Sequence, residues 1–102
     1  MINRKGKGRS WEYKVRDYLR DNKCFVIRQA SSTFPDLIAV KTNGKIMAVE
    51  CKTSKGGLSK KERNKLISLH SMYKMLPYVA YPKYSCYSEK KGNIVLKRVK
   101  NG

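Results

Sequence analysis

PDLIAVKTNGKIMAVECK, residues 35–52, contains two short apolar runs, LIAV and IMAV, joined by a segment with the pair Asn43-Gly44. An Asn-Gly pair between apolar runs is the strongest short-range signal for a β-hairpin, so the two runs are predicted to pair antiparallel. Three ionisable residues, Asp36, Glu50 and Lys52, lie within or beside these predicted strands. Charged side chains are rarely buried without a partner, so these three residues indicate a candidate functional site.

The register of the hairpin decides whether these charged residues meet. Side chains two positions apart on a strand project from the same face, so Glu50 and Lys52 are predicted to lie side by side. A loop made of the Asn-Gly pair alone would place Asp36 opposite Cys51 and point it away from Glu50. A three-residue loop, 42–44, with its glycine in the left-handed conformation, would place Asp36 opposite Glu50. Because glycine suits that turn, we expect the three-residue loop.

Asp36 and Glu50, so placed, form a candidate metal site. Two carboxylates a few ångströms apart repel each other unless a cation lies between them or one is protonated. Hard oxygen ligands with room for water suit Mg²⁺, with Mn²⁺ as a substitute, better than zinc. A metal there can polarise a phosphate oxygen and activate water, while Lys52 stabilises developing charge, which is phosphodiester hydrolysis chemistry. The alternative, a surface pair of Glu50 and Lys52 with a turn residue at Asp36, stays open because the pattern is short.

The overall charge predicts a polyanionic partner. Lys and Arg number 24 against 7 Asp and Glu, which gives a formal charge of +17 over 102 residues. Neutralising phosphates releases condensed counterions, so DNA or RNA is the first expectation. An anionic membrane surface is the competing partner, but the sequence has no long apolar segment, signal-peptide core or broadly apolar basic helix. A protein merely kept soluble by its charge is the remaining alternative.

The sequence patterns predict one mixed α/β domain over residues 1–102, because a chain of this length supports one modest core. The expected order of helices and strands is αβββαββ, after a flexible basic arm (1–9). The first half is a helix from Ser10 to about Asn22, a strand (24–29) and the hairpin. The second half is a helix that begins at the capping box of Ser59 and Glu62 and ends at Pro77, followed by strands 78–81 and 93–99. We expect the helices to pack on a central sheet.

The three cysteines, Cys24, Cys51 and Cys86, are widely spaced and lack a CxxC pair or a histidine cluster. Neither a disulfide framework nor a zinc site is predicted. A reducing, intracellular setting follows, either the cytoplasm or, for a viral protein, that of the host cell.

Taken together, these elements resemble the PD-(D/E)xK nuclease superfamily, through Pro35-Asp36 and the segment Glu50-Cys51-Lys52. Within it, nearly the whole chain resembles the archaeal-type Holliday junction resolvases, the Hjc and Hje group. The shared features are a basic glycine-containing arm, a helix with an internal Glu in RKGKGRSWEYKVRDYL, and a strand ending in Arg28 with Ser32 four residues on. The resemblance implies a restriction-endonuclease-like fold and an Mg²⁺-dependent homodimeric endonuclease that nicks opposing strands of four-way DNA junctions in recombination and repair.

The resemblance also implies residue roles. Asp36 and Glu50 would be the principal metal ligands, Glu12 would complete the site, Lys52 would assist the water, and Ser32 and Arg28 would act near the scissile phosphate. Two alternatives remain open: Glu12 as an acid that favours the helix N-terminus, and Ser32, which adjoins Ser31 and Thr33, as an ordinary loop serine.

Basic residues that flank the candidate site in sequence are predicted to bind the arms of the DNA. They are Arg4, Lys5, Lys7 and Arg9 in the arm and Lys55, Lys60 and Lys61 before and in the second helix. Two other functions stay open: a nuclease of this fold that acts on flaps, nicks or duplex sites, and a non-catalytic nucleic-acid-binding module with structural carboxylates.

Overall fold

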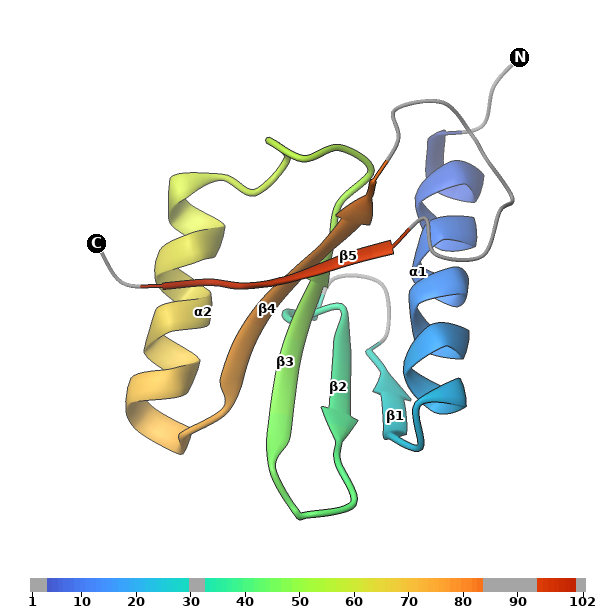
Figure 1. Cartoon of the computed structure of the whole chain (residues 1–102). Helices are drawn as coiled ribbons and strands as arrows, with labels where there is room; N and C mark the ends of the chain where they lie inside the picture. Colours follow the sequence, from blue (N-terminus) through green and yellow to red (C-terminus); the bar gives the residue numbers. More distant parts are fainter. Residues whose placement is uncertain (1–3, 30–32, 84–93, 101–102) are drawn as a thin grey trace.

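One mixed β-sheet lies in the middle of the molecule, with a helix on each side (Figure 1). The computed structural model describes residues 4–29, 33–83 and 94–100. The elements are α1 (Arg4–Asp21), β1 (Phe25–Arg28), β2 (Leu37–Val40), β3 (Ile46–Cys51), α2 (Lys60–Tyr73), β4 (Leu76–Pro82) and β5 (Ile94–Arg98). The strands lie in the order β1-β2-β3-β4-β5, and all neighbours are antiparallel except the parallel pair β3 and β4. The predicted order αβββαββ is confirmed.

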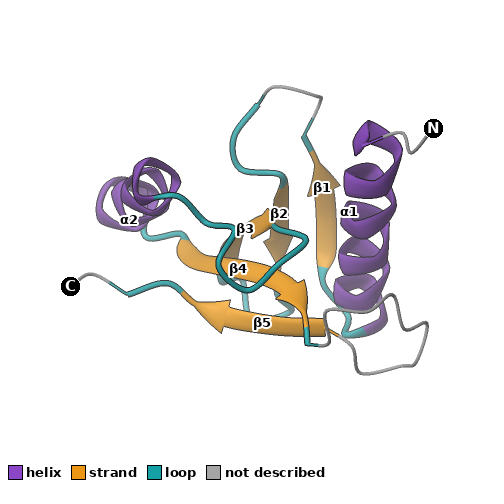
Figure 2. Ribbon diagram, turned by 90° about the horizontal axis from the view of Figure 1, so that it is seen from above, coloured by secondary structure: helices purple, strands orange, loops and turns teal. Residues whose placement is uncertain are grey.

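The two helices cover opposite faces of the sheet (Figure 2). From α1, the buried stripe of Trp11, Val15 and Leu19 packs on one face, with helical spacing that places all three side chains toward the strands. The indole Nε1 of Trp11 donates a hydrogen bond to the Ala80 carbonyl of β4 at 3.2 Å, which fixes α1 against the sheet. From α2, the buried Leu66 packs on the other face in a separate cluster.

The β2–β3 hairpin has the predicted register. Leu37 pairs with Val49 and Val40 pairs with Ile46. The loop between the strands is three residues long, because Lys41 donates its N–H to the Lys45 carbonyl at 2.8 Å. Its glycine, Gly44, has a φ of 86°, the left-handed value that the turn requires. Asp36, one residue before Leu37, therefore lies opposite Glu50, as expected.

Helix α1 begins at Arg4 and not at Ser10, so residues 4–9, expected to form a flexible arm, are its first turns. Adding residues to an existing helix costs far less than starting one, so a helix held on the sheet by Trp11 and Val15 can extend beyond its packed part. The absence of an apolar period in residues 4–9 was therefore a poor guide to the helix start.

Helix α2 begins as predicted and ends earlier than predicted. Ser59 is its N-cap, and the capping box with Glu62 is complete. The helix ends at Tyr73 because Lys74 adopts a left-handed conformation, with a φ of 60°. Pro77, expected to end the helix, lies within β4 opposite Ala48. Within the described parts of the chain, neither helix is long and apolar enough to span a bilayer.

Candidate active site

Asp36 and Glu50 meet where β2 begins and β3 ends. The Asp36 N–H donates to Oε1 of Glu50 at 3.0 Å, and the Cys51 N–H donates to Oδ2 of Asp36 at 2.8 Å. Each carboxylate therefore accepts a hydrogen bond from the backbone of the opposite strand. The hairpin register places both acids at one end of the sheet, as the sequence predicted.

Glu50 is the one charged side chain that is buried among the described residues, with 5 % of its surface exposed. Burial, and next the Asp36 side chain beside it, raise the pKa of Glu50 from its ordinary 4.5 to about 9. With no metal ion beside the pair, Glu50 is therefore expected to hold a proton at neutral pH. Two carboxyl groups that cannot both ionise unaided form a position where a divalent cation is strongly favoured.

Glu12 reaches the same place from α1. Its Oε2 lies 3.2 Å from Nη2 of Arg28, so an ion pair joins α1 to β1. Burial and then the charge of Asp36 raise the pKa of Glu12, and Arg28 opposes both effects. Asp36 therefore interacts with Glu12 on one side and with Glu50 on the other.

The interpretation of Glu12 as an acid favouring a helix N-terminus loses its basis. The stabilisation of an acid by the helix dipole falls off within the first turn. Helix α1 begins at Arg4, and its first turn contains no acidic residue. Glu12 lies two turns further along the helix, where its partner is Arg28.

Arg28 is oriented by two neighbours. Besides the pair with Glu12, its guanidinium lies 5.0 Å from the ring centre of Tyr13. Its Nε is buried and has no hydrogen-bond partner in the described part of the structure. A guanidinium that pairs with Glu12 and still has an unsatisfied donor is suited to an anionic group such as a phosphate.

The ammonium of Lys52 lies between two carboxylates. Its Nζ is 3.9 Å from Oε2 of Glu50 and 2.5 Å from Oε2 of Glu62. The pairing with Glu50 follows from their spacing on β3, whereas the sequence pattern around Glu62 indicated only the capping box of α2. A capping acid has a second carboxylate oxygen, but a sequence does not tell where that oxygen points.

The oxygen atoms of these acids are donors of the kind that a divalent cation takes. No group of three or more His, Cys, Asp or Glu residues in the described ranges is arranged to hold a metal ion as it stands. Mg²⁺, however, is commonly held by one or two carboxylates, with waters and substrate phosphates as its other ligands. The adjacent oxygens of Asp36 and Glu50 fit that requirement, and Glu12 reaches the pair only through Asp36.

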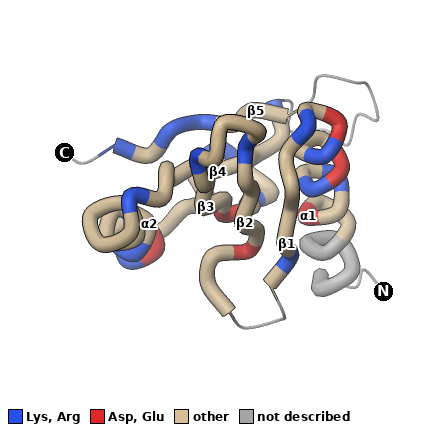
Figure 3. Tube along the Cα trace, turned by 90° about the horizontal axis from the view of Figure 1, so that it is seen from below, with Lys and Arg blue, Asp and Glu red and all other residues tan. Residues whose placement is uncertain are grey.

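The other predicted residues are distributed around this centre. Ser32 lies outside the described residues. Arg4, Lys5, Lys7 and Arg9 belong to the first turns of α1, and Lys55, Lys60 and Lys61 are exposed on the loop before α2 and on its first turn. Figure 3 shows short acidic segments on α1 and near β2 and β3 within a chain whose charged residues are mostly basic.

The match to a known protein family extends over most of the chain. Residues 2–92 match the family described as archaeal Holliday junction resolvase (Hjc). The chain belongs to the Hjc family. Its mixed five-stranded sheet with two helices is accordingly the restriction-endonuclease-like architecture that the sequence predicted.

Two Hjc proteins illustrate the similarity. The chain is 36 % identical over 83 residues to the crossover junction endodeoxyribonuclease Hjc of Methanocaldococcus jannaschii, a match that covers 78 % of this chain and 62 % of that protein. It superposes with a TM-score of 0.63, at 27 % identity, on Hjc of Archaeoglobus fulgidus, a Holliday junction resolvase from a hyperthermophile. That match covers 74 % of this chain and 63 % of the other. The chain thus spans somewhat less than two thirds of the length of both relatives.

Proposed function

We propose that this protein is an Mg²⁺-dependent endodeoxyribonuclease that resolves four-way DNA junctions by paired nicks. The observation that carries the proposal is the contact between Asp36 and Glu50, with Lys52 beside them, in a member of the Hjc family. A buried acid beside a half-buried one, a pair that favours a divalent cation, within a chain of charge +17, is the arrangement expected for hydrolysis of a phosphodiester.

The residues would divide the chemistry as follows. Asp36 and Glu50 would hold Mg²⁺, or Mn²⁺ in its place, and Glu12 would hold a water near them. The bound ion would polarise the scissile phosphate and lower the pKa of a water. Lys52 would stabilise the negative charge that develops on the phosphate. Arg28 would hold a neighbouring phosphate oxygen, and Ser32 would contact the scissile phosphate, a role that rests on the family resemblance.

The test compares a labelled, immobile four-way junction with a duplex of equal length, each in Mg²⁺ and in EDTA. We expect paired nicks in the junction only, and only with Mg²⁺. Equal cleavage of both substrates would remove the junction preference and favour a nuclease that acts on other DNA structures. Binding without cleavage in either metal would favour a non-catalytic binding module. DNA as the substrate also implies that the protein works inside the cell.

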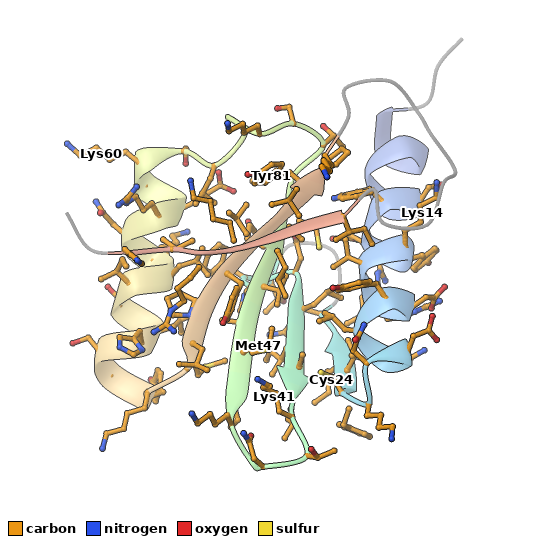
Figure 4. All side chains as sticks on the ribbon, viewed as in Figure 1. Lys14, Cys24, Lys41, Met47, Lys60 and Tyr81 are labelled. Atoms are coloured by element: carbon orange, nitrogen blue, oxygen red, sulfur yellow. The ribbon has the colours of Figure 1, made fainter. Side chains whose placement is uncertain are left out.

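A groove beside the site is a candidate surface for a DNA arm. It is lined by Phe34 and by residues of α2 that include Lys60, Lys61 and Lys65. The ammonium of Lys65 lies 5.5 Å from the ring centre of Phe34. Lys60 projects outward from the first turn of α2 (Figure 4). Three ammonium groups along one wall of a groove suit a phosphate backbone.

Neutralising two of these lysines should reduce the salt dependence of binding. Each phosphate contact contributes about one unit to the slope of log K against log salt, so Lys60→Gln with Lys61→Gln should flatten the slope by about two. Lys41, at the other end of the molecule from Lys60 (Figure 4), and Lys45, whose carbonyl accepts a hydrogen bond from the Lys41 N–H across the hairpin, provide the matched control. Titrations at several salt concentrations measure both pairs, and equal slopes for the two double variants would contradict the assignment.

We also propose that the protein is a homodimer, joined through the face of β1 and β2 that α1 leaves open (Figure 2). Phe25 pairs with Val40 and Ile27 with Ile38, and Val40 in turn pairs with Ile46, so these five side chains share one face. Phe25, Ile27 and Ile46 are exposed. Contiguous exposed apolar side chains of this size are typical of a protein interface, and a second copy of the chain is the partner that the family resemblance implies.

Phe25→Glu should convert the dimer into a monomer. A large aromatic side chain near an interface centre commonly contributes 2 kcal/mol or more, so the dissociation constant should rise by roughly thirtyfold or more. Met72→Glu is the control, because Met72 on α2 is equally exposed, at 69 %, and lies off this face. Sedimentation should find the wild type and Met72→Glu as dimers. A monomeric wild type, or a dimeric Phe25→Glu, would contradict the proposed interface.

A further inference from the structure

Lys52 is contacted at both ends of its side chain by the segment that follows it. At the head, Nζ lies 2.5 Å from Oε2 of Glu62, in the first turn of α2. At the stem, the backbone of Gly57 comes so close that a Cβ on Gly57 would lie 3.0 Å from Cβ of Lys52 and 3.3 Å from its Cγ. The loop from β3 to α2 therefore closes over the lysine.

Glu62 has two functions because its carboxylate has two oxygens. Oε1 accepts a hydrogen bond from the Ser59 N–H at 3.0 Å, and the Glu62 N–H donates to Oγ of Ser59 at 3.1 Å, which completes the capping box. The box leaves Oε2 for Lys52. Although burial opposes ionisation, hydrogen bonds from Lys52 and Ser59 lower the pKa of Glu62 to about 2, so it stays charged at any working pH. The helix start and the lysine are thus linked through one side chain.

A lysine needs such support more than most catalytic groups. Its ammonium is a compact charge on a flexible four-carbon stem with substantial rotamer entropy. Without Glu62, the nearest acid in the described part of the structure is Glu50, 3.9 Å from Nζ. A closer pair with Glu50 would occupy an oxygen that the proposed function assigns to Mg²⁺.

We propose that Glu62 and Gly57 are positioning residues for Lys52, which hold its ammonium beside the scissile phosphate and away from a close pair with Glu50. The inference rests on the proposed function, since it concerns the role of Lys52 in nicking. Glu62 acts on the head of the lysine by charge, and Gly57 acts on the stem by leaving room for it.

The first test separates the ion pair from the helix cap. Glu62→Gln keeps an oxygen for the Ser59 N–H but removes the charge that holds Lys52. Ser59→Ala damages the same cap and leaves the charge in place, so it is the matched control. A 1 Å displacement can cost about a hundredfold in rate, so Glu62→Gln should slow single-turnover nicking by roughly ten- to a hundredfold, with junction affinity almost unchanged. Ser59→Ala should nick at nearly the wild-type rate.

The second test uses adjacent glycines. Gly57→Ala should displace the Lys52 stem and slow nicking, whereas Gly56→Ala, whose added Cβ would meet no atom within 4 Å, should not. Both changes restrict the loop backbone similarly. Because a Cβ at Gly57 would also lie 3.2 Å from the Ser54 carbonyl, a double-mutant cycle with Lys52→Ala separates the contact with Lys52 from a shift of the loop.

A double-mutant cycle decides the mechanism. With Lys52→Ala already present, Glu62→Gln and Gly57→Ala should slow nicking no further, because there is no lysine left to position. Equal losses with and without Lys52, or full activity of Glu62→Gln, would overturn the inference while leaving the proposed function intact. A wild type that nicks nothing would overturn both, and the junction assay identifies that case before any variant is compared.

Discussion

Asp36→Asn is expected to reduce single-turnover nicking of a four-way junction by about a thousandfold or more, with junction binding retained. Asp36 is the acid that contacts both of the others, since its side chain raises the pKa of Glu12 and that of Glu50. An amide in its place can still accept the Cys51 N–H through one oxygen, so the end of β3 should keep its geometry. It supplies no negative charge to a cation.

The binding measurement distinguishes this loss from misfolding. Removing an acid beside the DNA lowers electrostatic repulsion, so in EDTA the variant should bind the junction at least as tightly as the wild type. Asp17→Asn makes the same chemical change on the exposed side of α1, where Asp17 pairs with Arg16, and should leave nicking unchanged. Nicking by Asp36→Asn within tenfold of the wild-type rate, or parallel losses of nicking and binding, would contradict the assignment of Asp36 as a metal ligand.

The central part of this site could be predicted because it is encoded locally. Asn43-Gly44 determines the loop, the loop determines the register, and the register brings Asp36 to Glu50. Lys52 follows from strand alternation alone. Each step involves neighbours along the chain or across one hairpin, for which sequence rules are reliable.

The remaining parts depend on packing between distant elements. Nothing near Glu12 in the sequence indicates that Arg28 is its partner, since the pair forms only when α1 docks on β1. In the same way, Glu62 reaches Lys52 because α2 packs beside β4, which lies parallel to β3. The start of α1 was missed for a related reason. Residues 4–9 are helical because they extend, toward the N-terminus, a helix whose packed residues lie from Trp11 onward.

Glu50→Gln should stabilise the protein in EDTA above neutral pH, although it removes one of the two proposed ligands of Mg²⁺. In the folded chain the pKa of Glu50 is raised to about 9, first by burial and then by Asp36, against an ordinary 4.5 when unfolded. Between these values the folded chain binds a proton that the unfolded chain does not. Stability therefore falls as pH rises through this window, by up to about 1.4 kcal/mol per unit.

The expected loss for the wild type between pH 5 and pH 8.5 is on the order of 4 kcal/mol, measured by urea unfolding in EDTA. Glu50→Gln should lose much less, because glutamine carries no titrating proton and can still accept the Asp36 N–H. A smaller slope should remain, since the pKa of Glu12 is also raised. Glu62→Gln is the control, and its effect on stability should have the opposite sign. The pKa of Glu62 is lowered to about 2, so Glu62 stays ionised across this pH window. Loss of its charge should therefore lower the stability of the protein at every pH in the window.

Mg²⁺ should reverse the pH effect in the wild type alone. A cation that needs the ionised carboxylate competes with the proton, so binding tightens as pH rises, and the stabilisation it adds should be greater at pH 8.5 than at pH 6. Glu50→Gln should gain little at either pH, because Asp36 remains as a single carboxylate. An equal gain in wild type and variant would show that the ion is held elsewhere. A wild type whose stability does not fall with pH would show that Glu50 is ionised without a cation, and the physical reason for placing Mg²⁺ at this hairpin would be lost.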